Sequence, residues 1–103
     1  MKVNTKSELF NTLRDQQSRL QQFGVKRCGV FGSFVRGMQS DQSDVDLLVE
    51  FEPGKKSFDN FMGLALFLEE TIGRRVEVVT LESLSPYIGP HILREVEYAS
   101  TGQ

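Results

Sequence analysis

Two carboxylates in this sequence have the spacing needed to bind a divalent metal ion, and a third is a candidate to join them. Asp44 and Asp46 are two residues apart in an alternating stretch. Both side chains therefore point to the same face of a strand, roughly 7 Å apart along the chain. Mg²⁺ is usually bound by one or two carboxylates together with the phosphates of a substrate, so the pair suits this ion. Glu77 lies in a second alternating stretch, and it would supply a third carboxylate, and room for a second metal ion, if the two strands are neighbours.

A Gly32-Ser33 dipeptide has the chemistry of a phosphate-binding turn. Glycine lets a ligand approach the backbone closely, N–H groups at the start of a helical turn favour an anion, and the serine adds a hydroxyl donor. Taken alone, neither Gly-Ser nor Asp-x-Asp is specific, because a solvated strand face also carries aspartates. Periodicity does not place Gly32-Ser33 near Asp44.

The elements that must position these residues are read from periodicity and from helix caps. Thr5 and Glu8 have the spacing of a capping box, and Gly24 and Gly73 are suitable helix ends. The sequence predicts, in order, a helix over 5–23, a strand over 25–31, a short helical turn from 33 or 34 to 37, a loop over 38–43, a strand over 44–51, a helix over 58–72, a strand over 75–80 and short helical pieces over 81–99. This order favours an α/β (α+β) fold in which a small mixed β-sheet has its helices packed mainly on one side.

The strand over 44–51 has the clearest pattern in the chain. Its alternation divides it into two faces. One face is expected to carry Val45, Leu47, Val49 and Phe51, and the other to carry Asp44, Asp46, Leu48 and Glu50. Because the aspartates share a face with Leu48, that face is not expected to be simply solvent-exposed.

Composition limits the class of protein. The 103 residues suffice for one domain, expected over 1–103, and 39% hydrophobic and 25% charged residues are ordinary for a soluble globular chain. The net charge is −2 and the 12 Lys and Arg are scattered, which argues against a nucleic-acid partner. There is no apolar run of about 20 residues and no signal-like N-terminus, so no membrane association and a cytoplasmic location are expected. Cys28 has no partner cysteine and is expected to be a small core hydrophobe.

The motifs together match a known family. The segment GSFVRGMQSDQSDVDLLVEF resembles the signature of the nucleotidyltransferase superfamily related to DNA polymerase β, in which Gly-Ser is followed after a spacer by Asp-x-Asp. Ser33 and Asp44 enclose ten residues, which is the spacing of the minimal nucleotidyltransferases of prokaryotes. The similarity continues through RVEVVT and LSPYIGPHILREVEYA, and so covers nearly the whole chain from Val25 onward.

The resemblance implies a role for each matching residue. Gly32 and Ser33 would bind the triphosphate of ATP, and Asp44 and Asp46 would hold Mg²⁺, as two ions. Glu77 occupies the position where these small proteins usually have aspartate, and its side chain is one methylene longer. Arg36 matches an arginine typical of the group, and it would contact phosphate or the acceptor, or else pair with a nearby carboxylate. His91 is far in sequence from the motifs and is not predicted to be catalytic.

The resemblance also implies an activity and a partner. Minimal nucleotidyltransferases are typically paired with a HEPN-domain protein, often as antitoxin and toxin. The chain is then expected to transfer AMP from ATP to a tyrosine of a HEPN ribonuclease toxin, with release of pyrophosphate. One alternative is a non-catalytic antitoxin that keeps the fold and blocks its partner by contact. Another, an antibiotic or tRNA nucleotidyltransferase, is disfavoured by the short length and the lack of a basic surface.

Overall fold

The computed structural model describes residues 2–100. Its elements, in chain order, are α1 (Lys6–Asp15), α2 (Gln17–Gln22), β1 (Val25–Phe31), α3 (Ser33–Arg36), β2 (Val45–Phe51), α4 (Phe58–Ile72), β3 (Val76–Thr80), the 3₁₀ turn η1 (Leu81–Ser83), α5 (Gly89–Glu95) and β4 (Glu97–Ser100). The strands form one sheet in the order β3-β2-β1-β4. The β2–β3 pair is parallel and the other two pairs are antiparallel, so the predicted mixed sheet is confirmed.

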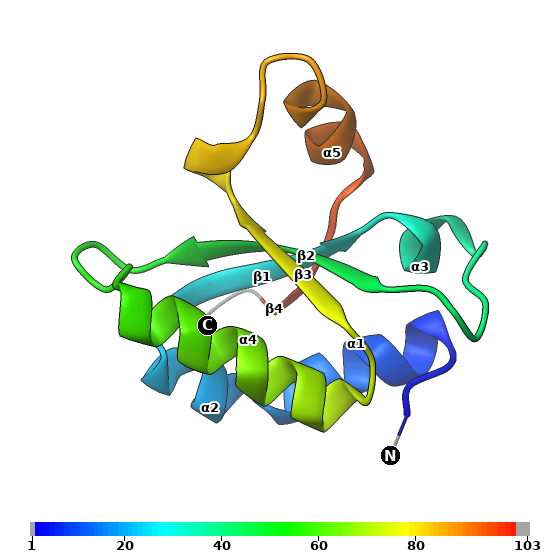
Figure 1. Cartoon of the computed structure of the whole chain (residues 1–103), viewed down its shortest axis with the longest axis horizontal. Helices are drawn as coiled ribbons and strands as arrows, with labels where there is room; N and C mark the ends of the chain where they lie inside the picture. Colours follow the sequence, from blue (N-terminus) through cyan, green and yellow to red (C-terminus); the bar gives the residue numbers. More distant parts are fainter. Residues whose placement is uncertain (1, 101–103) are drawn as a thin grey trace.

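The helices are distributed unequally over the two faces of the sheet. Figure 1 shows α1, α2 and α4 together on one face and α5 on the other. The hydrophobic core lies between the sheet and these three helices. It includes Leu9 and Leu13 of α1, Leu64 and Leu68 of α4, and Leu47 of β2. The prediction of helices mainly on one side is therefore confirmed.

The two faces of β2 follow the predicted alternation. Val45, Leu47 and Val49 are fully buried or nearly so and belong to the core. Leu48 is also buried, but it lies outside that core cluster, on the face that carries Asp46. The strand begins at Val45, one residue later than predicted, so Asp44 precedes it.

The N-terminal helical region differs from the single helix predicted over 5–23. The capping box is present, since Thr5 accepts a hydrogen bond from the N–H of Glu8 and the Glu8 side chain accepts one from the N–H of Thr5. The helix is then interrupted at Gln16, which has φ −98° and ψ 16°, and α2 starts at Gln17. This break lets both helices pack against the sheet, with Leu20 of α2 buried.

The C-terminal segment contains a strand that the sequence did not reveal. Helical pieces were predicted over 81–99, and η1 and α5 account for the first part. The last part is β4, which pairs antiparallel with β1 at the edge of the sheet. Four residues are too few for an alternating pattern to stand out.

Cys28 is fully buried in the core, as expected of a small hydrophobe, and burial raises the pKa of its thiol to about 12.

Within residues 2–100, none of the helices combines the length and the apolar character that a membrane span requires.

Candidate active site

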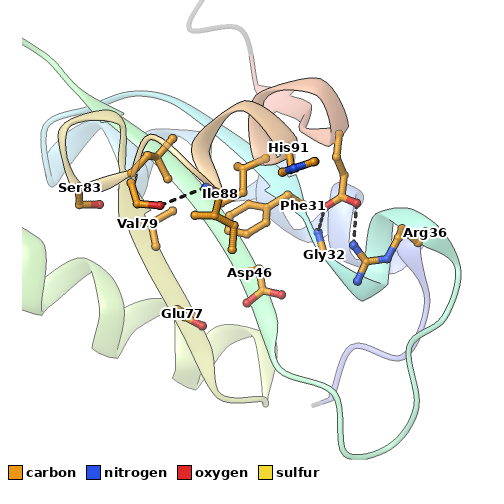
Figure 2. Close-up of a pocket in the computed structure, with 13 residues that line it drawn as sticks. Phe31, Gly32, Arg36, Asp46, Glu77, Val79, Ser83, Ile88 and His91 are labelled. Atoms are coloured by element: carbon orange, nitrogen blue, oxygen red, sulfur yellow. Dashed lines mark hydrogen bonds and ion pairs between the residues drawn. The ribbon is translucent and has the colours of Figure 1, made fainter.

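The strand register brings the separate sequence motifs to one place. Asp46 on β2 lies opposite Phe31, the last residue of β1, so that Gly32 follows beside it. On the other side, Asp46 is in register with Glu77 of the parallel strand β3. Figure 2 shows Asp46 between Gly32 and Glu77. The sheet thus supplies the proximity that periodicity could not, and the expected neighbouring position of the Glu77 strand is confirmed.

Gly32 is in contact with Asp46 in a way that no other residue type would permit. A Cβ atom built on Gly32 would collide with Asp46 Oδ2. The backbone of Gly32 also has φ 82° and ψ −153°, a conformation that is essentially restricted to glycine. Gly32 is followed at once by Ser33, which begins α3. The Gly-Ser turn is therefore held against the carboxylate of Asp46.

A pocket of about 570 Å³ opens over this region, between the sheet and the segment that contains α5. Four of the six predicted site residues line it, namely Gly32, Arg36, Asp46 and Glu77. The rest of its wall is apolar in part (Phe31, Val79, Leu84, Ile88 and Ile92) and polar in part (Ser83, Ser85, His91 and Glu95). A pocket with an acidic base and a partly apolar wall can accommodate a phosphorylated, ring-containing ligand.

Ser33 and Asp44 do not line this pocket. Asp44 is exposed and lies just before β2, while Ser33 is partly buried at the start of α3. The charge of Asp44 nevertheless reaches Asp46, because it is one of the groups that raise the pKa of Asp46.

The protonation of Asp46 reflects its burial first and the neighbouring negative charges second. Burial, followed by the charges of Glu77 and Asp44, raises the pKa of Asp46 to about 6, although Arg36 opposes the shift. Within residues 2–100, neither Asp44 nor Asp46 nor Glu77 takes part in an ion pair. Asp46 is half-buried, whereas Asp44 and Glu77 are exposed. A divalent cation would stabilise a half-buried carboxylate that has two further carboxylates near it and no ion-pair partner.

The donor set therefore fits Mg²⁺. Its oxygens are hard ligands, and two of the carboxylates come from neighbouring strands in direct register. Asp46 and Glu77, with Asp44 at the edge, are the residues that would hold the ion. Over the described residues, no three His, Cys, Asp or Glu side chains form a ready-made metal cluster.

The structure adds a residue that sequence reasoning missed. Glu95, the last residue of α5, accepts hydrogen bonds from the N–H of Gly32 and from Arg36 Nη1, both at 2.7 Å. These contacts hold the pKa of the Glu95 carboxyl below its usual range, the Gly32 N–H having the largest effect. No signal in the sequence links Glu95 to Gly32, because 63 residues separate them. Of the alternatives for Arg36, an ion pair with a carboxylate is observed, and the arginine also lines the pocket.

A second missed residue supports the loop that leads to Asp44. Arg74 is buried, and its guanidinium donates to the backbone carbonyls of Ser40 and Ser43 at 2.9 and 2.8 Å. It also donates to the carbonyl of Val3 and packs against the ring of Phe34. Arg74 therefore fixes the loop whose end carries the first aspartate. Sequence alone gave no reason to separate it from the other scattered arginines.

His91 has an unexpected position. It lines the pocket from α5, although it is far in sequence from the motifs and was not predicted to be catalytic. Its Nδ1 lies 3.1 Å from Arg94 Nη2.

Comparison with known proteins agrees with this geometry. The family model for the nucleotidyltransferase domain matches residues 11–99. A protein adenylyltransferase, MntA, of Thermococcus cleftensis is 41% identical over 99 residues, covering 95% of this chain and 99% of its own. A relative from Methanocaldococcus jannaschii, whose name also designates a protein adenylyltransferase, is 43% identical over 76 residues, covering 74% of this chain and 81% of its own.

Solved structures show the same fold. One described as a minimal nucleotidyltransferase has a TM-score of 0.70 and 36% sequence identity, covering 85% of this chain and 93% of that one. The crystal structure of a toxin–antitoxin with AMP-PNP has a TM-score of 0.67, covering 97% of this chain and 76% of that one, and at 21% identity the likeness concerns the fold alone. With a family model matched over most of its length and relatives that it covers almost end to end, this chain belongs to the nucleotidyltransferase domain family.

Proposed function

We propose that this nucleotidyltransferase is a Mg²⁺-dependent protein adenylyltransferase that acts in the cytoplasm as an antitoxin. Its acceptor is a tyrosine of a partner HEPN ribonuclease toxin, which AMP transfer would neutralise. One observation carries the chemical part of the proposal: Asp46 lies in register with Glu77 on one side and against the Gly32-Ser33 turn on the other. The likeness to relatives named protein adenylyltransferase supports a protein acceptor.

The reaction forms one bond and breaks another. The tyrosine oxygen attacks the α-phosphorus of ATP, the bond from that phosphorus to the bridging oxygen of the β-phosphate breaks, and pyrophosphate leaves. The proton of the tyrosine hydroxyl passes to a carboxylate, for which Glu77 is the candidate. Bound Mg²⁺ supplies charge neutralisation at the phosphates and activation of the acceptor hydroxyl.

The residues of the chain bind and orient the reactants. Gly32, whose N–H already donates to Glu95 Oε2, lets the triphosphate approach the backbone closely, and Ser33 supplies its hydroxyl. Arg36 has five N–H donors, and one of its nitrogens already donates to Glu95, so the others can face phosphate. Asp44, Asp46 and Glu77 would hold the metal. Catalysis of this kind consists largely of positioning and charge stabilisation.

The test is transfer of label to the partner. The chain and its partner are incubated with Mg²⁺ and with ATP labelled either at the α-phosphate or at the γ-phosphate. We expect the partner to retain the α label and not the γ label, to gain the mass of one AMP at a tyrosine, and to lose ribonuclease activity. Replacement of that tyrosine by phenylalanine should abolish the transfer.

The matched variants are Asp44→Asn/Asp46→Asn and, as a control, Asp15→Asn at the exposed end of α1. The double variant should neither transfer AMP nor neutralise the toxin, whereas the control should do both. No transfer by the wild type, with full neutralisation by the double variant, would instead identify an antitoxin that works by contact alone.

A further inference from the structure

The carboxylate of Glu95 connects two parts of the site, the Gly32-Ser33 turn and Arg36. Its Oε2 accepts from the N–H of Gly32 and its Oε1 accepts from Arg36 Nη1, each at 2.7 Å. The dashed bonds that end on Gly32 and Arg36 in Figure 2 mark this bridge. Hydrogen bonds that involve ionised groups at this distance are strong and directional.

At Gly32 the bridge satisfies a donor that the sheet leaves unpaired. Gly32 lies one residue beyond Phe31, which is the last paired residue of β1, and Gly32 is buried. A buried N–H without an acceptor destabilises the structure, and Glu95 provides that acceptor. The same contact fixes the peptide at a residue whose backbone conformation is accessible only to glycine. The direction in which the following residue, Ser33, presents its hydroxyl depends on this peptide.

At Arg36 the bridge restrains a side chain that is otherwise free to move. Slightly more than half of the Arg36 side chain is exposed, against about a fifth of Glu95. Within residues 2–100, Arg36 makes one ion pair, and its partner is Glu95. Holding one of its nitrogens orients the planar guanidinium, and the remaining donors stay available on the pocket side.

The bridge also comes from an element with few other anchors at the site. Gly89 and Ile92 are the buried residues of α5, so most of this helix is exposed. Glu95 joins the end of that helix to the phosphate-binding turn, and the pocket lies between them.

We propose that Glu95 is a positioning residue for nucleotide binding. It orients the Gly32-Ser33 turn and Arg36 for the triphosphate and does not itself contact the substrate. This inference rests on the proposed function, since it concerns the same nucleotide. The alternative use of such a carboxylate, as an internal anion that occupies the phosphate site until ATP displaces it, predicts the opposite effect of its removal.

The experiment measures the affinity of the full chain for AMP-PNP with Mg²⁺ by isothermal titration calorimetry, and KM for ATP and kcat with the partner present. In Glu95→Gln one of the two acceptor oxygens becomes an NH₂ donor, so one bond of the bridge is lost. We expect Kd and KM to rise about tenfold, the size typical of losing a supporting hydrogen bond behind a binding group, with kcat changed less than about twofold. Glu95→Asp, which keeps both oxygens on a shorter side chain, should lie between the wild type and Glu95→Gln.

The matched control is Glu97→Gln, which also removes a glutamate charge and an ion pair, in this case with Lys6 of α1, and neither residue lines the pocket. It should leave Kd and KM unchanged. A double-mutant cycle with Arg36→Gln should be non-additive, because the two residues form one unit. Thermal melting of each variant separates weaker binding from unfolding.

Two outcomes would overturn the inference while leaving the proposed function intact. Unchanged nucleotide affinity in both Glu95 variants would show that the bridge is only structural, and tighter binding would show that Glu95 competes with phosphate. If the wild type itself failed to bind AMP-PNP with Mg²⁺, both this inference and the proposed function would be wrong.

Discussion

The two faces of the sheet differ in what they contribute, and adjacent residues of β2 show the difference. Leu47 is fully buried against the helices and belongs to the core. Asp46, one residue earlier, points to the opposite face, where burial and neighbouring carboxylates raise its pKa to about 6. One face therefore lowers the free energy of the folded state, and the other raises it by holding like charges together. The division predicts that substitutions on the two faces separate stability from activity.

The largest effect is expected from Asp46→Asn. Loss of this metal-binding charge should reduce AMP transfer about a thousandfold, because stabilisation of charge by a bound metal contributes several kcal/mol to the transition state. The melting temperature of the metal-free chain should not fall, since a repelling charge is removed. Steady-state label transfer and thermal melting measure the two quantities. A variant that retained transfer within tenfold of the wild type would place the chemistry elsewhere.

On the opposite face, Leu47→Ala should lower the free energy of unfolding by about 3 kcal/mol through the cavity it leaves. Below its melting temperature the variant should still bind AMP-PNP with Mg²⁺, because the side chain does not reach the pocket. Urea denaturation provides the free energy, and Leu66→Ala is the control, because Leu66 is 63% exposed on α4 and should change stability by less than about 0.5 kcal/mol. Equal stability of the two variants would contradict the assignment of the core.

At Arg74 we expect stability and nucleotide binding to be affected together. Arg74→Met removes the donors to the carbonyls of Ser40 and Ser43, so we expect a loss of about 2 kcal/mol in stability. It should also weaken nucleotide binding, since the loop leading to Asp44 is no longer held. The exposed neighbour offers the control, Arg75→Lys, which should change neither quantity. Loss of stability with normal nucleotide affinity would show that the loop does not depend on Arg74.

The smallest effect is a dependence of stability on pH. In the folded chain the pKa of Asp46 is raised to about 6, above the 3.8 that is ordinary for an aspartate. The stabilising effect of its proton is therefore fully present below about pH 4 and is lost as the pH rises through 6. With a chelator present to remove metal ions, the free energy of unfolding of the wild type should fall by about 1 kcal/mol relative to that of Asp46→Asn between pH 4.5 and 7.5. This value allows for the solvent that screens a half-buried group. Parallel stability curves for the two chains would exclude a raised pKa at Asp46.

The sequence predicted those parts of the molecule that depend on local patterns. Alternation in the 44–51 stretch separated Asp46 from Leu47, and the need for a third carboxylate on the same face suggested the correct neighbour, the Glu77 strand. Glu95 and Arg74 could not be predicted, because their partners lie 63 and more than 30 residues away in the chain and nothing local marks them. Likewise β4 is defined by its pairing with β1, and the break at Gln16 by the packing of two helices, both of which are long-range effects.

The most direct test of the account is to map the nucleotide by NMR. Amide resonances of the isotopically labelled chain are followed while AMP-PNP is added in the presence of Mg²⁺. The account predicts that shifts concentrate at Gly32, Ser33, Arg36, Asp46 and Glu77, and that α1 and α4 show none of comparable size. Shifts concentrated on the α1 and α4 face, or no shifts at saturating nucleotide, would contradict it.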